Sequence, residues 1–162
     1  MSDAAASPSS TAFGFLVDTL RASGLVLTEH PEQSTVSFLH AGERSEWSVF
    51  CRAREGLPQV AVYSLYPHAV PASRRGVVGE LLTRANYGLF IGNFEMDLDD
   101  GEVRFKTSLD FAGDRLSGAL LAGLIEHNLA SFERYLPTID AATAGGVDVE
   151  AMLAAVEGDA RS

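Results

Sequence analysis

The sequence predicts an α+β domain in which an antiparallel sheet packs against helices, in the order αβββαββα plus a short C-terminal helix. Apolar and polar residues alternate through Ser45–Arg54, as they do in a half-buried strand. A second alternating stretch, at residues 90–111, is interrupted by Asp100-Gly101, a dipeptide typical of hairpin turns. Two further segments, near residues 13–20 and 117–136, carry apolar residues at helical spacing. The two periodicities together favour a mixed fold.

The first half of the chain is predicted to contain one helix and three strands. The helix begins near Thr11 and ends before Gly24, which is expected at the C′ position. Its apolar stripe consists of Phe13, Leu16, Val17 and Leu20. The strands are expected at Ser34–His40, Ser45–Arg54 and Gln59–Tyr66, each rich in β-branched or aromatic residues.

The second half is predicted to begin with a helix after Pro71, because proline suits the first helical turn. Asn86 follows the apolar stripe of this helix and is expected to help end it. After a hairpin, Ser117 is a credible N-cap for a long helix, which Pro137 is expected to interrupt. A last amphipathic helix is expected at residues 149–156.

The hairpin at residues 90–111 is the stretch whose pairing the residues specify most closely. A type I′ turn at Asp100-Gly101 would place Glu95 opposite Lys106 on the polar face, as an opposite-charge pair. In that register Phe90 points into the core. The acidic residues of the turn lack the ligand spacing of a calcium loop, so they predict no metal site.

Length and composition predict a single domain at residues 11–157, between disordered tails at 1–10 and 158–162. The formal charge of −10 argues against unspecific nucleic-acid binding, which depends on basic patches. Arg74, Arg75 and Arg84 could form a local patch or the solvated face of a helix. No segment has the charge pattern of a signal peptide or the length of a membrane span. With one cysteine, the chain is expected to be cytoplasmic.

The ionisable and nucleophilic residues form no recognisable catalytic, cofactor or metal motif. The four histidines lack ligand spacing with one another and with Cys51. Cys51 alternates with apolar residues, so it is predicted to be a small buried hydrophobe. No phosphate-binding loop or dinucleotide fingerprint is present. We therefore expect no catalytic residue, no cofactor and no metal site, and an enzyme is disfavoured.

Three apolar residues fall where the pattern calls for polar ones. Phe50 lies on the polar side of its strand, and Leu89 and Ile91 share the parity of the polar face of the hairpin. Exposed apolar residues often mark contacts with a partner, so these three are candidate partner or dimer contacts. The alternative is that the chain's own helices cover both faces of the sheet.

The run TRANYGLFIGNFEMDLDDGEVRFKTSLDF, preceded by YSLYPHAVP and followed by a helix ending in RYLP, resembles the YbjN-like family of bacterial proteins. Members are described as "putative sensory transduction regulators". The resemblance implies the fold of type III secretion chaperones, which are small, acidic, usually homodimeric proteins that bind a segment of a client. It implies no catalytic residues. The extra C-terminal helix and the N-terminal tail are departures from those chaperones.

Residues and resemblance together predict a non-enzymatic adaptor or chaperone-like regulator, acting as a homodimer in a bacterial stress or regulatory response. The partner is expected to be a protein, with no direct nucleic-acid contact and no membrane contact. The acidic chain would favour a basic or mixed-charge client. The alternative is a sensor that binds a small molecule between sheet and helix.

Overall fold

The structure is a computed structural model that describes residues 11–146 and 148–158. The tail expected at 1–10 lies outside the described residues, and so does the tail expected at 158–162 except for Gly158, which ends a helix. The first elements are α1 (Ala12–Ala22), β1 (Thr28–His30), the 3-10 helix η1 (Pro31–Gln33), β2 (Thr35–Ala41), β3 (Glu46–Arg54) and β4 (Gln59–Leu65). The remaining elements are α2 (Arg75–Gly88), β5 (Asn93–Met96), β6 (Val103–Asp110), α3 (Gly118–Ala144) and α4 (Val149–Gly158).

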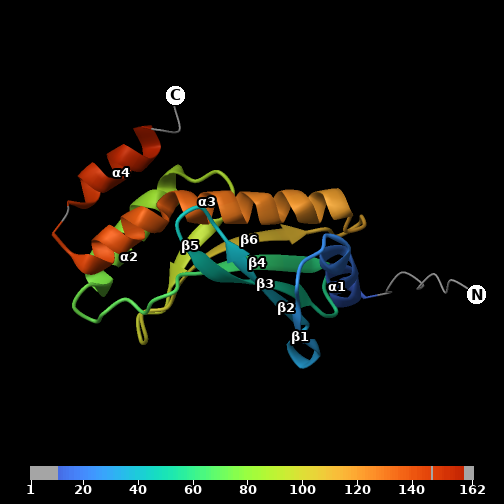
Figure 1. The fold of residues 1–162 in the computed structure, drawn as a ribbon. Helices are drawn as coiled ribbons and strands as arrows, with labels where there is room; N and C mark the ends of the chain where they lie inside the picture. The colour runs from blue at the N-terminus through green and yellow to red at the C-terminus, as the bar shows by residue number, and fades with distance from the viewer. Residues whose placement is uncertain (1–10, 147, 159–162) are drawn as a thin grey trace, which may run out of the picture.

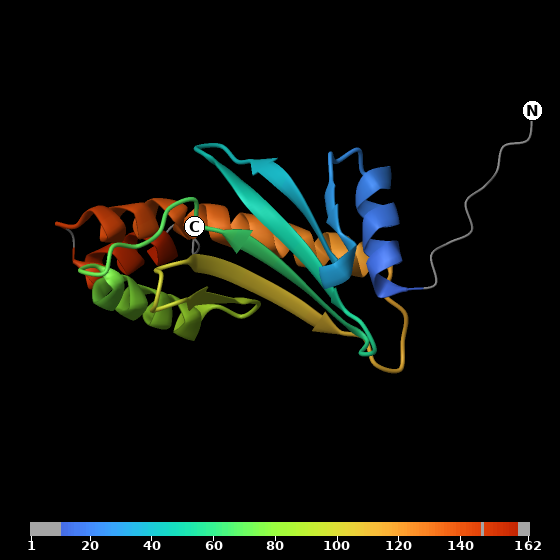
Figure 2. The same ribbon diagram turned by 90° about the horizontal axis from the view of Figure 1, so that it is seen from below.

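The fold class and the element order predicted from the sequence are confirmed, with one short strand added. All strand pairs are antiparallel, and the sheet order is β1-β2-β3-β4-β6-β5. Strand β1 was not expected, because three residues are too few to show alternation. The helix α1 contacts β2 and β3, and α3 contacts β4 and β6. The helices lie on one side of the sheet, and the other side faces the viewer in Figure 2 without a helix in front of it (Figures 1 and 2).

The core fills the layer between the sheet and its helices. Alternate residues of β3 and β4 are buried, which is the strand pattern expected for a sheet with one covered face. The buried residues of β3 are Trp47, Val49, Cys51 and Ala53. The helix α3 supplies the facing apolar stripe, which includes Leu121, Leu124 and Phe132. Burial of these side chains removes apolar area from water at about 25 cal/mol per Å² and is the main stabilising contribution.

One polar residue, Asn128 of α3, lies fully buried in this apolar layer. Its Nδ2 donates to the carbonyl oxygens of Val62 and Phe105 at 2.9 and 3.1 Å. Its Oδ1 accepts from Ser64 Oγ at 2.6 Å, and Ser64 in turn accepts from Trp47 Nε1 at 2.9 Å. A buried polar network in which each member is paired fixes the position of α3 on β4 and β6.

Helix ends follow the predicted caps, except at Pro137. Thr11 and Ser117 accept hydrogen bonds from the first turns of α1 and α3, and Gly24 has a φ of +80° after α1. The helix α3 continues through Pro137 to Ala144, so the predicted interruption is wrong. Proline removes one helical hydrogen bond, but residues beyond it, including Ile139, are buried in the core. Tertiary packing therefore outweighs the local preference.

The predicted hairpin forms, but its register and turn differ from the prediction by two residues. Glu95 lies opposite Arg104, not Lys106. The loop between Asp97 and Glu102 contains four residues, and only Gly101 among them has a positive φ, so a type I′ turn is excluded. The Val70 N–H donates to the Gly101 carbonyl at 2.9 Å, which shows how the loop packs on the chain before α2. A shift of two residues preserves the faces, because strand side chains alternate with a period of two.

The segment before β5 also differs from the prediction, because α2 is longer and β5 shorter than expected. Asn86 lies inside α2, and Leu89 is the C-cap residue of that helix. Gly92 has a φ of +81°, and the strand begins after it. Phe90 is therefore in a connection rather than a strand, and its side chain is 100% exposed instead of buried.

Candidate partner-binding face

The side of the sheet opposite the helices carries the candidate site, which we call the open face. It consists of Phe50, Arg52 and Arg54 of β3, Gln59, Ala61 and Tyr63 of β4, and Arg104, Lys106, Ser108 and Asp110 of β6. The antiparallel register aligns these residues in rows across the three strands. Side chains alternate between the two faces of a strand, and these residues alternate with the buried ones, so they lie on the face away from the core.

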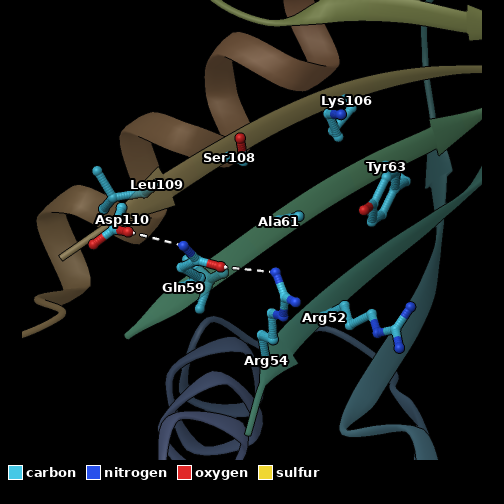
Figure 3. A pocket seen from close by; sticks show the side chains of 10 residues that line it. Arg52, Arg54, Gln59, Ala61, Tyr63, Lys106, Ser108, Leu109 and Asp110 are labelled. Carbon is cyan, nitrogen blue, oxygen red and sulfur yellow. Dashed lines mark hydrogen bonds between the residues drawn. The ribbon is translucent and has the colours of Figure 1, made fainter. Parts of the chain in front are cut away.

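A shallow depression of about 520 Å³ lies in the middle of the open face (Figure 3). Arg52, Ala61 and Ser108 form one row of the register across β3, β4 and β6. Ala61 and Ser108 have small side chains, so the sheet is hollow there and longer side chains surround the hollow. Phe50, Tyr63 and Lys106 form the next row.

The row at the opposite end is linked by hydrogen bonds. Arg54 Nη1 donates to Gln59 Oε1 at 3.3 Å, and Gln59 Nε2 donates to Asp110 Oδ2 at 2.8 Å (Figure 3). These bonds span β3, β4 and β6. The bond from Gln59, with a second bond from the Ala112 N–H, lowers the pKa of the Asp110 carboxyl below its ordinary value. Asp110 is therefore an anion at neutral pH, at the border of the depression.

The opposite border carries a second charged group, in which two cations share one carboxylate. Arg104 Nε lies 2.8 Å from Glu95 Oε2, and Lys106 forms an ion pair with the other oxygen of Glu95. Burial alone would raise the pKa of Glu95, but the hydrogen bonds and charges of Lys106 and Arg104 outweigh it and lower the pKa. The Arg104 guanidinium also lies 4.8 Å from the centre of the Tyr63 ring.

Apolar side chains continue the open face toward β2. Phe50 is half-buried and lies directly opposite Tyr63 in the register and opposite Ser37 of β2. Leu39, two residues along β2, is 62% exposed. The open face thus combines an aromatic pair with arginine side chains, and aromatic and arginine residues are enriched in protein interfaces.

The three predicted contact residues do not form one surface. Phe50 belongs to the open face, whereas Leu89 and Ile91 lie in the connection between α2 and β5. Strands β4 and β6 lie between β3 and β5. Leu89 is half-buried against the core, and Ile91 is 42% exposed. Their assignment as partner contacts stays a prediction.

Two aromatic residues near Ile91 were missed as candidate contacts. Tyr87 is 96% exposed and Phe90 is 100% exposed. We call Tyr87, Phe90 and Ile91 the terminal patch. The alternating pattern predicts a buried Phe90 only if the strand extends back to residue 90, whereas β5 begins at Asn93. Tyr87 could have been found as an aromatic residue outside the apolar stripe of α2.

The backbone edge of β5, next to the terminal patch, is blocked by a side chain. The Phe94 N–H donates to Asn86 Oδ1 at 2.7 Å, and Asn86 Nδ2 donates to the Phe94 carbonyl at 3.0 Å. The Asn86 amide therefore occupies backbone groups that a further strand would use. This contact disfavours partner binding by strand addition at β5.

Other reactive or charged groups have structural surroundings. Burial raises the pKa of the Cys51 thiol to about 12, so the thiol is protonated at neutral pH, as its predicted role as a buried hydrophobe requires. Arg74 donates to the carbonyl of Ala142 near the end of α3, and Arg75 donates to the carbonyls of Val70 and Leu98. These two arginines therefore hold the fold together rather than forming a separate basic patch.

Metal-binding clusters and membrane-spanning helices are absent from the part of the chain that the structure describes. Within residues 11–146 and 148–158, no three His, Cys, Asp or Glu side chains gather closely enough to hold a metal ion. No helix in the same part of the chain combines the length and the apolar character needed to cross a membrane.

Comparisons with known proteins identify the family. A comparison with curated proteins found no match. The crystal structure of YbjN from E. coli, described as "a putative transcription regulator", matches with a TM-score of 0.59 and 11% identity. The match covers 80% of this chain and 92% of that one and shows a shared fold. The family model YbjN, described as "putative bacterial sensory transduction regulator", matches residues 16–141. Because this match spans well over half of the sequence, the chain belongs to the YbjN family.

Proposed function

We propose that the protein is a non-enzymatic, protein-binding adaptor or chaperone-like regulator in a bacterial stress or regulatory response. The observation that carries the proposal is the open face, a sheet surface without a helix over it that presents Phe50, Tyr63 and several cations. Aromatic and arginine side chains around a depression are typical of interface centres. The regulator description of the family and the type III secretion chaperone-like fold implied by the resemblance support the same role.

We propose further that the protein acts in the cytoplasm as a homodimer. A second copy is the occupant proposed for the terminal patch, since the patch holds two almost fully exposed aromatic residues beside a blocked strand edge. Side-chain packing across a twofold axis would cover Tyr87 and Phe90 without strand pairing. Phe90→Ser should then convert a dimer into a monomer in sedimentation velocity. A wild type that is monomeric at all concentrations would exclude the dimer.

The adaptor proposal is tested by placing a photo-crosslinking amino acid on the open face in the native cell. With the crosslinker at Phe50, we expect reproducible adducts with a partner protein. The matched control places it at His127, which is exposed on α3. The partner is then purified, and Tyr63→Ser should weaken its affinity at least about tenfold, as truncation of an interface aromatic does. Equal adducts from both positions would contradict the proposal.

The second candidate function is a sensor that binds a small molecule in the depression. The observation that favours it is the chain of hydrogen bonds from Arg54 through Gln59 to Asp110, which gives the hollow a polar border. Thermal-shift screening against metabolites tests this function, with Ala61→Phe as a variant that fills the hollow. A stabilising compound whose effect persists in Ala61→Phe would bind elsewhere.

A further inference from the structure

We infer that the open face binds an acidic, extended segment of the partner protein, a conclusion that rests on the proposed adaptor function. The charged side chains lining the depression are three cations, Arg52, Arg54 and Lys106, and one carboxylate, Asp110. The chain as a whole carries a formal charge of −10. The open face is therefore a positive surface on an acidic protein, and charge complementarity selects a negative occupant. The basic client favoured by overall charge is not what this face fits.

Two of these cations have no ion pair among the described residues. Lys106 and Arg104 share the carboxylate of Glu95. Arg54 donates only to the neutral amide of Gln59, and Arg52 is exposed on the same strand. Arginine side chains without a carboxylate partner can form bidentate hydrogen bonds with a carboxylate from another chain.

The spacing of these groups along β3 defines a pattern for the occupant. Arg54, Arg52 and Phe50 are alternate residues of one strand, so each Cα atom is about 7 Å from the next one in this series. An extended segment lying along β3 repeats with the same period. It can place acidic side chains at two alternate positions against Arg54 and Arg52, and an aromatic side chain at the next against Phe50. The pattern is acidic-x-acidic-x-aromatic. The negative charge of Asp110 on β6 repels the acidic end of the segment, so that end lies over β3.

Other occupants fit the open face less well. Face-to-face pairing of two copies would bring the same unpaired arginines close to one another, which is repulsive in an interface. Nucleic acid would meet these cations, but the formal charge of −10 opposes its approach. An acidic segment carries fewer negative charges than nucleic acid does, and it is short enough to contact only the cations of the open face.

The test measures binding of fluorescent nine-residue peptides by anisotropy. The probe is Gly-Ser-Glu-Ser-Glu-Ser-Phe-Ser-Gly, and the matched probes carry Gln or Lys in place of both Glu residues. The wild type should bind the Glu peptide at least about tenfold tighter than the Gln peptide, with weaker binding at high salt, as paired charges require. The double variant Arg52→Glu/Arg54→Glu should lose this binding. The control Arg44→Glu/Arg115→Glu has the same net charge but changes exposed residues outside the open face. This control should still bind the Glu peptide.

Several outcomes would overturn the inference. These are equal binding of the Gln or Lys peptide, unchanged binding by Arg52→Glu/Arg54→Glu, tighter binding of a twelve-nucleotide oligothymidylate, or a changed oligomeric state in that variant. Both arginines are exposed, so thermal melting should show that the variant folds. If the purified partner binds and depends on Tyr63 while the Glu peptide does not bind, the adaptor function stands and this inference falls.

Discussion

Two regions of the molecule differ in how tightly their residues are constrained. One is the corner, where α2 packs against the β5–β6 hairpin, and the other is the open face of the sheet. In the corner, which we define by Asn86, Gly92, Phe94 and Gly101, a Cβ added to either glycine would overlap neighbouring atoms, and the Asn86 amide is hydrogen-bonded to the Phe94 backbone. On the open face, side chains surround a hollow and two arginines lack ion pairs within the described residues. The run that resembles the family includes the four corner residues and also the β6 residues of the open face. The corner residues hold the fold together, whereas the candidate partner contacts lie where packing constrains the side chains least.

The glycines of the corner show this constraint directly. Gly92 has a φ of +81°, and a Cβ there would lie 2.6 Å from the Phe105 ring and 2.8 Å from the Lys106 carbonyl oxygen. Gly101 has a φ of +84°, and a Cβ there would overlap the Val70 carbonyl oxygen. Only glycine combines this backbone conformation with so close an approach.

Gly101→Ala should have the largest effect on stability. A side chain at positive φ and an overlap with backbone atoms together should cost about 2–4 kcal/mol of unfolding free energy. The matched control is Gly56→Ala, because Gly56 has a φ of +82° but no atom within 4 Å of the added Cβ. Urea denaturation of both variants measures the difference. Equal losses would mean that conformation alone, and not packing on Val70, sets the requirement for glycine.

Asn86→Ala should have the next largest effect. It leaves the N–H and carbonyl of Phe94 without their partner and should lower the unfolding free energy by about 1–3 kcal/mol. It also frees the edge of β5, so light scattering should show more self-association. Asn93→Ala is the control, because the Asn93 amide makes only hydrogen bonds of 3.4 Å. A larger loss from Asn93→Ala would contradict the role of Asn86.

Glu95→Gln connects the two regions, because Glu95 lies on β5 and pairs with the cations of β6. The folded-state pKa of Glu95 is below its ordinary value of 4.5, so the carboxylate stabilises the protein above that pH. This contribution is lost as the pH falls through the folded-state pKa. At pH 7 the variant should be less stable by about 1 kcal/mol or less, and the difference should shrink as the pH falls below 4.5.

Glu80→Gln is the matched control, because Glu80 forms an exposed pair with Arg84. Exposed ion pairs contribute little, so denaturation at pH 7 should show a change of less than about 0.5 kcal/mol for this control. A constant difference between Glu95→Gln and the wild type from pH 3 to 7 would show that the charge of Glu95 is not responsible.

Arg52→Gln should have the smallest effect on stability. Arg52 is exposed and unpaired among the described residues, so the unfolding free energy should change by less than about 0.5 kcal/mol. The same substitution at Arg75, which donates to the carbonyls of Val70 and Leu98, should cost about 1–2 kcal/mol. Binding of the Glu peptide should respond in the opposite order. A stability loss at Arg52 as large as that at Arg75 would remove the contrast between the two regions.

The sequence predicted the parts of the fold that depend on local periodicity. Alternation placed Trp47 and Cys51 in the core, and the hydroxyl caps and Gly24 marked the ends of helices. The prediction at Pro137 was wrong, because local propensity does not include the burial of residues beyond it. The hairpin register was wrong by two residues, because the packing of Gly101 on Val70 selects a longer loop.

The candidate site was only partly predictable, and for a related reason. Phe50 was identified because its side chain breaks an alternating pattern within one strand. Arg52, Tyr63 and Lys106 could not be grouped, because the pairing of β4 with β6 joins residues 39 to 51 positions apart in the sequence. The position of Leu89 depended on where α2 ends, and α2 extends further than its apolar stripe.

By itself, the sequence determined the α+β class, the element order, the burial of alternate strand residues and the family. These properties depend on residues close together in the chain, where propensity and period act. Only the tertiary structure decided which face of the sheet remains uncovered, which arginines lack an ion pair among the described residues and which strand edge is blocked. Those properties depend on side chains brought together from distant strands and helices, and their balance of burial, charge and hydrogen bonding exists only after folding.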